Sequence, residues 1–135
     1  MIEIRGHREG ELGWIEEQTQ AALSKHASAV VADEGGQIVG MVAFDSWTES
    51  AATGHMAVVR PSVWCRLLGP AFDYVFRQQK RWILYGVIPS DRHRALRFVE
   101  GIGFRIRSKL PDGWARGVDM IVWEMRREGC RFLRG

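Results

Sequence analysis

The sequence predicts one α+β domain, in which three or four helices pack on both faces of a central mixed, mostly antiparallel sheet of about six or seven strands. Segments typical of strands and of helices follow one another in the order β-α-β-β-β-α-β-α-β-β. The chain has 135 residues, of which 46% are hydrophobic, enough to fill one modest core. Its two cysteines, Cys65 and Cys130, have neither zinc-site nor disulfide-framework spacing. Residues 1–135 are therefore expected to form a single domain without a metal.

The first half of the chain predicts a strand, a helix and three further strands. A short strand at 2–5 precedes a helix at about 8–23, whose early acidic residues suit the positive end of the helix dipole. The runs 29–33 and 37–47 are rich in β-formers and are joined by a Glu-Gly-Gly turn, which is typical of a hairpin. A third run at 55–59 ends just before a proline, which cannot continue a central ladder.

Apolar pairs recur every four residues from Val63 to Phe76, which is a helical period. The pair Gly69-Pro70 interrupts this pattern. Because proline fits the first helical turn far better than the interior, we expect the main helix to start at Pro70 and to end near Lys80. The alternative is a helix that begins at Ser62 and kinks at the proline.

The last third of the chain predicts a strand, a helix and a terminal antiparallel hairpin. The almost continuous apolar run 81–88 favours a strand buried on both faces and parallel to its predecessor. Residues 89–91 supply a stop and a helix N-cap, and a helical face follows until Gly101 and Gly103. The hairpin runs from Phe104, through a Pro-Asp-Gly turn at 111–113, to a strand at about 118–125.

Charge is distributed unevenly along the chain. Residues 1–50 hold three bases and nine acids, a balance of 3 − 9 = −6, whereas residues 51–135 hold 16 bases and seven acids, a balance of 16 − 7 = +9. Most of the bases are arginine, whose planar fork suits phosphate groups. Either an anionic ligand binds the second half or its basic faces are simply solvated. The N-terminus has no hydrophobic stretch behind a basic start, and no run is long enough to span a bilayer, so we expect a cytoplasmic protein.

Two local motifs resemble the GNAT superfamily of acyl-CoA-dependent N-acetyltransferases. Arg66-Leu67-Leu68-Gly69-Pro70-Ala71 matches the family's Gln/Arg-x-x-Gly-x-Gly/Ala loop, and the segment 95–104, which ends in Gly-Phe, follows its pattern for the next helix and strand. The resemblance covers about residues 2–125. Within the superfamily, the chain looks most like small acetyltransferase-like proteins of tailed bacteriophages.

The resemblance implies acetyl-CoA as co-substrate, a primary amine as acceptor, no metal, and a parallel strand pair at the cofactor site. The loop would bind the pyrophosphate, the preceding strand would bond the pantetheine arm with its backbone, and an arginine at the next helix start would reach the 3′-phosphate. The residues so implied are Arg66, Leu67, Leu68, Gly69, Ala71, Ala57, Val58, Val59 and Arg92. Pro70 departs from the pattern because it has no N–H to offer a phosphate. The simpler interpretation is that Gly69 and Pro70 only start a helix.

Acetyl transfer to an amine needs a base. Relatives often use a carboxylate on the strand before the loop, and none stands between Ala51 and Val63. His55 is the titratable side chain in that strand, and imidazole is suited to proton transfer near neutral pH. Asp45 and Glu49 are alternatives. Each of the three could equally be structural.

The proton donor of many relatives is a tyrosine on the helix after the parallel strand, at the position that is Val99 here. Tyr85, Ser90, Asp91 and His93 are the substitutes that the sequence offers, although Ser90 and Asp91 are also explained as helix N-cap residues.

The acceptor is not encoded clearly. Acids in the first helix would suit a cationic amine, namely Glu9, Glu11, Glu16 and Glu17. Two alternatives to catalysis remain: a catalytically inactive GNAT-fold protein with a structural role in a virion or a binding role, and a basic nucleic-acid-associated protein with a pI near 9.2. A homodimer is possible.

Overall fold

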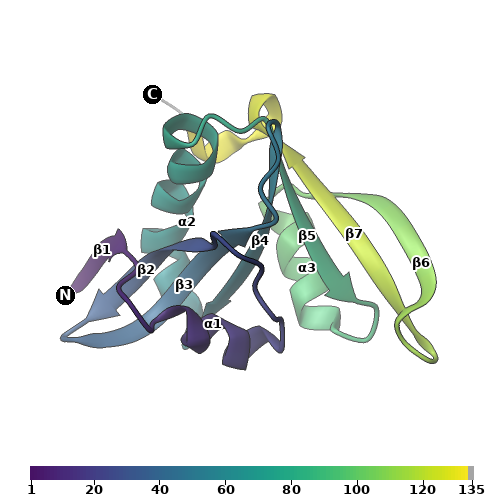
Figure 1. The fold of residues 1–135 in the computed structure, drawn as a ribbon, viewed down its shortest axis with the longest axis horizontal. Coiled ribbons are helices and arrows are strands. Elements are labelled where there is room, and N and C mark those ends of the chain that lie inside the picture. The colour runs from purple at the N-terminus through teal and green to yellow at the C-terminus, as the bar shows by residue number, and fades with distance from the viewer. Residues whose placement is uncertain (134–135) are drawn as a thin grey trace.

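A computed structural model describes residues 1–133. Seven strands form one sheet in the order β1-β2-β3-β4-β5-β7-β6 (Figure 1). Every neighbouring pair is antiparallel except β4 and β5, which are parallel. The predicted fold class, a mixed and mostly antiparallel sheet with one parallel pair, is confirmed. The strands are β1 (Ile2–Gly6), β2 (Ser28–Glu34), β3 (Gln37–Asp45), β4 (Ala51–Val58), β5 (Ile83–Pro89), β6 (Arg105–Ala115) and β7 (Val118–Arg126).

Helices cover both faces of the sheet and create two apolar clusters. Helix α1 (Leu12–Thr19) inserts Ile15 among Val31 and Met41 on one face. On the other face, α2 (Trp64–Asp73) and α3 (His93–Ile102) cover the larger cluster. Short helical turns complete the chain at Pro61–Val63, Tyr74–Gln78, Arg127–Gly129 and Arg131–Leu133. Among residues 1–133, no helix is long and apolar enough to cross a membrane.

Helix α1 is shorter than the predicted span 8–23 because polar contacts fix both of its ends. The Glu11 carboxylate accepts a hydrogen bond from the Arg8 N–H at 2.7 Å, which holds the preceding residues in a turn. At the other end, Gln20 adopts a left-handed conformation, with φ of 62°, and its N–H donates to the Glu16 carbonyl at 2.8 Å.

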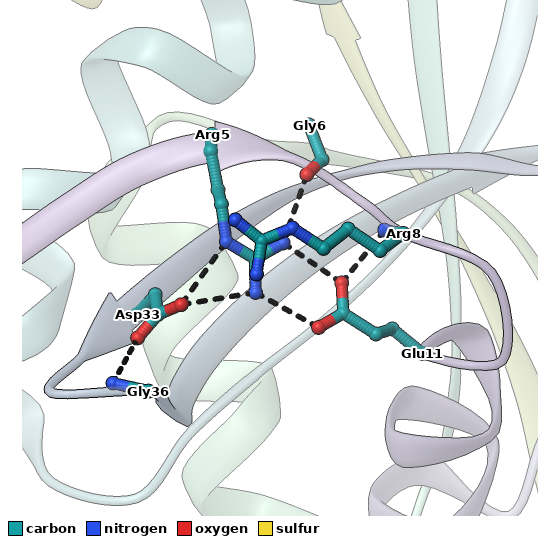
Figure 2. A network of polar contacts seen from close by, with 6 residues as sticks. All are labelled: Arg5, Gly6, Arg8, Glu11, Asp33 and Gly36. Carbon is teal, nitrogen blue, oxygen red and sulfur yellow. Dashed lines mark hydrogen bonds and ion pairs between the residues drawn. The ribbon is translucent and has the colours of Figure 1, made fainter.

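Arg5 ties the N-terminal elements together (Figure 2). Its Nη atoms donate to both oxygens of Glu11 at 2.8 Å, and its Nε donates to Asp33 Oδ2 at 3.1 Å. Asp33 in turn accepts from the Gly36 N–H at 2.8 Å. The hydrogen bonds between Arg5 and Glu11, more than any other cause, lower the pKa of Glu11 to about 2 and raise the pKa of Arg5. The cluster fastens β1 and the start of α1 to the β2–β3 hairpin.

The prediction of a helix starting at Pro70 is wrong, and the alternative start near Ser62 is correct. The turn at Pro61–Val63 leads directly into α2, so Pro70 lies inside the helix, which then continues as a π-helical turn at Tyr74–Gln78. Gly69 has no Cβ to clash with the proline ring, and this eases the helical conformation before Pro70. Burial of the apolar face, including Leu67 and Phe72 at 0% exposure, outweighs the lost hydrogen bond.

Two further predictions need correction. Strand β5 is not buried on both faces, because Tyr85 is half-buried and Val87 is 36% exposed on the face opposite α2 and α3. The Pro-Asp-Gly segment 111–113 does not form the last hairpin turn. It is an irregular part of β6, and the chain reverses at Arg116 and Gly117 instead.

Candidate active site at the diverging strands

Strands β4 and β5 are paired only at their beginnings. The parallel register runs from Ala51–Ile83 to Thr53–Tyr85, whereas β4 stays paired with β3 as far as Val58. Figure 1 shows the two strands moving apart beyond this point. One edge of β4 is therefore free of a strand partner from Gly54 onward.

The backbone groups on that free edge follow from the alternation of a strand. The Ser50 carbonyl accepts from the Ile83 N–H at 3.0 Å, so even-numbered residues direct their backbone groups toward β5. The Val59 N–H donates to the Val39 carbonyl at 2.9 Å, so odd-numbered residues face β3. Of the three residues predicted to bond pantetheine, Val58 therefore faces the free edge, whereas Ala57 and Val59 face the other way. Gly54 and Met56 share the free edge with Val58, and the sequence prediction missed them.

Gly86 of β5 leaves open space on the side of α2 and α3, and we call this space the hollow. Gly86 points to that side between Leu84 and Ile88, and a Cβ added there would meet nothing within 4 Å. On the same side of the sheet, Trp64 at the start of α2 stacks on Phe98 of α3, with 4.5 Å between the ring centroids.

On the opposite face, the structure brings together two of the predicted catalytic residues. His55 Nε2 on β4 lies 2.7 Å from Asp45 Oδ1 at the end of β3. Asp45 is 4% exposed, and its Oδ2 accepts the Ser24 N–H at 2.8 Å. An ionised carboxylate can only accept, so Nε2 is the donor in this contact, and in a neutral imidazole Nδ1 is then the nitrogen with the free lone pair. The contact with Asp45 thus orients the imidazole of His55.

The other catalytic candidates have different surroundings. Tyr85 lies on the same face as His55, because its register partner is Thr53, two residues before His55. Ser90 is occupied structurally: its Oγ accepts the Asp119 N–H and its own N–H donates to the Asp119 carbonyl, both at 2.9 Å. Neither Ser90 nor Asp91 is the N-cap of α3, which is Arg92. Glu49 is exposed in the β3–β4 loop.

The predicted pyrophosphate loop does not form, because residues 66–71 lie inside α2. The side chains of Leu67, Leu68 and Ala71 are at most 6% exposed in the core and cannot contact a ligand. The Arg66 guanidinium donates to the Ile2 carbonyl at 2.9 Å.

Gly69 lies within the helix, and Arg92 is exposed at the start of α3; their role in CoA binding stays a prediction. The chain enters helix α2 through residues 59–63, ahead of the motif. Pro61 was the residue in the sequence that marked this helix start, because proline is favourable at the first helical position.

The arrangement was compared with known proteins. No family model and no curated protein matches the sequence. Spermidine/spermine N-acetyltransferase SpeG from Vibrio cholerae is similar in structure, with a TM-score of 0.75 and 14% identity over 93% of this chain and 92% of that one. Its N152L mutant aligns with a TM-score of 0.78 and 14% identity over 98% and 96%. An acetyltransferase of the GNAT family from Desulfovibrio desulfuricans gives 0.75 and 15% over 93% and 99%. The fold is therefore that of GNAT acetyltransferases.

The described residues were also searched for side chains that could together bind a metal ion. Among residues 1–133, no group of three or more His, Cys, Asp or Glu side chains is placed to bind a metal ion.

Proposed function

We propose that this chain is an N-acetyltransferase that moves an acetyl group from acetyl-CoA to a primary amine. The observation that carries the proposal is the divergence of β4 from β5, with the oriented His55–Asp45 pair beside it. GNAT acetyltransferases share the fold, which supports the reaction class.

The residues at the strand edge fit the thioester arm of acetyl-CoA. The backbone of Met56 and Val58 can bond an extended chain in the manner of a strand, and the hollow at Gly86 leaves room beside it. The phosphate end is held less well, since Pro61 has no N–H and the Val63 N–H already donates to the Arg60 carbonyl at 3.1 Å. Arg60 could turn to a phosphate from its exposed pair with Glu34.

The protein's part in the chemistry is proton transfer and orientation. When bound, acetyl-CoA supplies an activated acetyl group whose carbonyl carbon accepts the amine nitrogen and whose sulfur leaves. His55 Nδ1 takes the proton that the acceptor nitrogen loses, and Asp45 stabilises the resulting imidazolium. Tyr85, on the same face, is the proposed donor to the departing sulfur. Val99, at the position of the tyrosine in many relatives, has a hydrocarbon side chain and no proton to donate.

The acids of α1 do not form a row for a cationic amine. Glu11 is bound to Arg5, and Glu16 Oε2 accepts the Leu23 N–H at 2.8 Å. Only Glu9 and Glu17 of the four predicted acids stay exposed. The acceptor is therefore proposed only as a primary amine.

The proposal includes further parts that await tests. Residues 1–135 would form one acyltransferase domain in the cytoplasm, where acetyl-CoA is available, and a phage origin is inferred only from the motifs. One similar structure is described as a dodecameric spermidine N-acetyltransferase from Vibrio cholerae. A homodimer is proposed for this chain, and light scattering after gel filtration would test it.

Thermal unfolding with excess acetyl-CoA tests the proposal first, with free CoA and ATP as controls. Ligand at about a hundred times its dissociation constant stabilises the native state by about 2.7 kcal/mol, several degrees in a domain of this size. Mass spectrometry of amines incubated with acetyl-CoA then tests transfer. Stabilisation without transfer to any amine would favour the inactive alternative. Binding to DNA that falls steeply with salt, without stabilisation by acetyl-CoA, would favour the nucleic-acid alternative.

A further inference from the structure

The segment 20–27 joins α1 to β2 without helix or strand. Two successive backbone N–H groups of this segment donate to carboxylates on different elements. The Leu23 N–H donates to Glu16 Oε2 of α1 at 2.8 Å. The Ser24 N–H donates to Asp45 Oδ2 at the end of β3, also at 2.8 Å. Because the two donors belong to neighbouring planar peptide groups, the position of the first restricts the position of the second.

Asp45 depends on this second bond because its side chain is buried. The residue is 4% exposed, its Oδ1 lies 2.7 Å from His55 Nε2, and its Oδ2 is satisfied by the Ser24 N–H. A buried carboxylate oxygen that loses its donor carries a large desolvation cost. Without the Ser24 N–H, the carboxylate would turn toward another donor, and the imidazole would lose its fixed partner. The location of Ser24 therefore controls the Asp45–His55 pair.

Glu16 is the member of this chain of contacts that belongs to a fixed element. Its neighbour Ile15 is 0% exposed and packs in the apolar cluster formed with β2 and β3, which fastens α1 to the sheet. The Glu16 carbonyl also accepts the Gln20 N–H at 2.8 Å. Glu16 thus holds the first residue of the segment with its backbone and Leu23 with its side chain.

The backbone around these contacts is held in unfavourable conformations. Gln20, His26 and Ser46 have φ of 62°, 65° and 52°, in the left-handed region that residues with a Cβ seldom adopt. The Ser46 N–H donates to Ser24 Oγ at 2.9 Å. Trp47 Nε1 donates to the His26 carbonyl at 3.1 Å. Such conformations persist only where the surrounding contacts impose them, so these hydrogen bonds, and not local preference, fix the course of the segment.

We propose that Glu16 is a positioning residue for the base of the reaction. Its carboxylate holds the chain at Ser24 so that Asp45 keeps the imidazole of His55 oriented, with Nδ1 free for the acceptor nitrogen. The proposal rests on the proposed function, in which that nitrogen atom takes the proton. Glu16 acts only through three successive hydrogen bonds of 2.8, 2.8 and 2.7 Å. This role differs from the attraction of a cationic acceptor that the sequence suggested for the acids of α1.

Kinetics of three variants test the role of the Glu16 oxygen. Glu16→Ala leaves the Leu23 N–H without its acceptor, and we expect kcat to fall about threefold to tenfold while the KM for acetyl-CoA stays within about twofold. Glu16→Gln keeps an oxygen that can accept, so its kcat should stay within about twofold of the parent. Glu17→Ala, at the exposed neighbour on the same helix, should do the same. An unchanged kcat in Glu16→Ala, or an equal fall in Glu16→Gln, would overturn the proposal.

A double-mutant cycle tests whether Glu16 acts through Asp45. Once Asp45→Asn has replaced the carboxylate, the loss of Glu16 should cost little further activity. We expect kcat of the combined Asp45→Asn and Glu16→Ala variant to lie within about twofold of that of Asp45→Asn alone. Fold losses that multiply would mean that Glu16 acts independently of the pair, and would contradict the positioning role.

NMR of the ¹⁵N-labelled full chain separates this proposal from the proposed function, because it needs no acetyl transfer. The contact with Asp45 should slow the exchange of the His55 Nε2 proton with water and give it a resonance of its own, assigned by its absence in His55→Gln. We expect this resonance in the parent and in Glu16→Gln, and its loss in Glu16→Ala.

Two results of the NMR and transfer measurements would divide the proposals. If the resonance is lost in Glu16→Ala but the parent acetylates no amine, the proposed function fails and Glu16 still positions the Asp45–His55 pair. If the parent acetylates an amine but the resonance persists unchanged in Glu16→Ala, the function stands and the positioning role is wrong.

Discussion

Asp45 Oδ1 lies 2.7 Å from His55 Nε2 across the β3–β4 pair, and the buried aspartate is itself held by the Ser24 N–H. One carboxylate thereby connects the β3–β4 pair to the segment that follows α1. The contact fixes both the tautomer and the direction of the imidazole, and leaves Nδ1 as the atom that can accept a proton.

Removing either member of this pair should slow transfer without removing the cofactor. His55→Gln lacks the base, and we expect kcat to fall by about 10²- to 10⁴-fold. Asp45→Asn keeps the shape but can reverse the tautomer, and a smaller fall of about tenfold or more is expected. Steady-state kinetics with a reactive amine measures both effects.

Glu49→Gln is the matched control, because Glu49 is the exposed carboxylate that the sequence offered as an alternative base. Its kcat should stay within about twofold of the parent. Unfolding curves of all three variants with acetyl-CoA must show the parent's ligand shift. If His55→Gln transfers acetyl groups at the rate of the parent, the imidazole takes no part in the reaction.

The location of the acetyl-CoA arm can be tested by substitutions at Gly86 and Arg66. Gly86→Val places a side chain in the hollow at β5 without meeting an atom within 4 Å at its Cβ, so the fold should persist. We expect this variant to lose most of the thermal shift caused by acetyl-CoA. Arg66→Ala should keep most of that shift, because Arg66 contacts the Ile2 carbonyl from within a helix.

The reverse result would restore the motif-based interpretation. A lost shift in Arg66→Ala together with a retained shift in Gly86→Val would mean that residues 66–71 bind the pyrophosphate and that the hollow is empty of ligand. Thermal unfolding of both variants without ligand separates this result from a general loss of stability.

The order of elements could be predicted because apolar periodicity and turn residues mark each segment locally. The start of α2 could not, because Pro70 predicts a boundary locally while the burial of Leu67 and Phe72 favours a continuous helix. The prediction that the continuous apolar run 81–88 is buried on both faces failed for a similar reason. Burial of Tyr85 and Val87 depends on whether a helix covers their face, and that is decided by tertiary structure.

The candidate site was predictable only in part. His55 could be singled out as the titratable residue in its strand, but its contact with Asp45 depends on the register that sets Ala43 opposite His55. No sequence pattern specifies that register, because a five-residue connection at 46–50 allows more than one. The motif at 66–71 lies in helix α2 and not in a loop, because Gly and Ala are also ordinary residues of a packed helix; its part in CoA binding stays a prediction.

Glu11 should make the stability of the fold depend on acid. Its folded-state pKa of about 2 lies below the ordinary 4.5, so its stabilising contribution is complete above pH 4.5 and is lost as the pH falls from 4.5 toward 2. Glu11→Gln should therefore destabilise the protein at pH 7 by roughly 1–2 kcal/mol, and by less at pH 3. Urea unfolding at both pH values measures the difference. Glu17→Gln, an exposed residue of the same helix, should change little. If Glu11→Gln lowers the free energy of unfolding equally at pH 7 and pH 3, the contribution of Glu11 to stability does not depend on its charge.

Replacing Pro70 should stabilise the protein. Pro70 is exposed in the interior of α2 and cannot donate to the Arg66 carbonyl, which costs a helix roughly 3 kcal/mol. Alanine restores the donor but gives the unfolded chain more freedom, worth about 1 kcal/mol, so Pro70→Ala should gain about 1–2 kcal/mol and raise Tm by several degrees. Pro61→Ala is the matched control, since proline at the helix start loses no hydrogen bond, and it should be neutral or slightly destabilising. If Pro70→Ala instead lowers Tm while Pro61→Ala does not, the chain needs proline at position 70 because the helix begins there, and residues 66–69 return to being a loop that could bind phosphate.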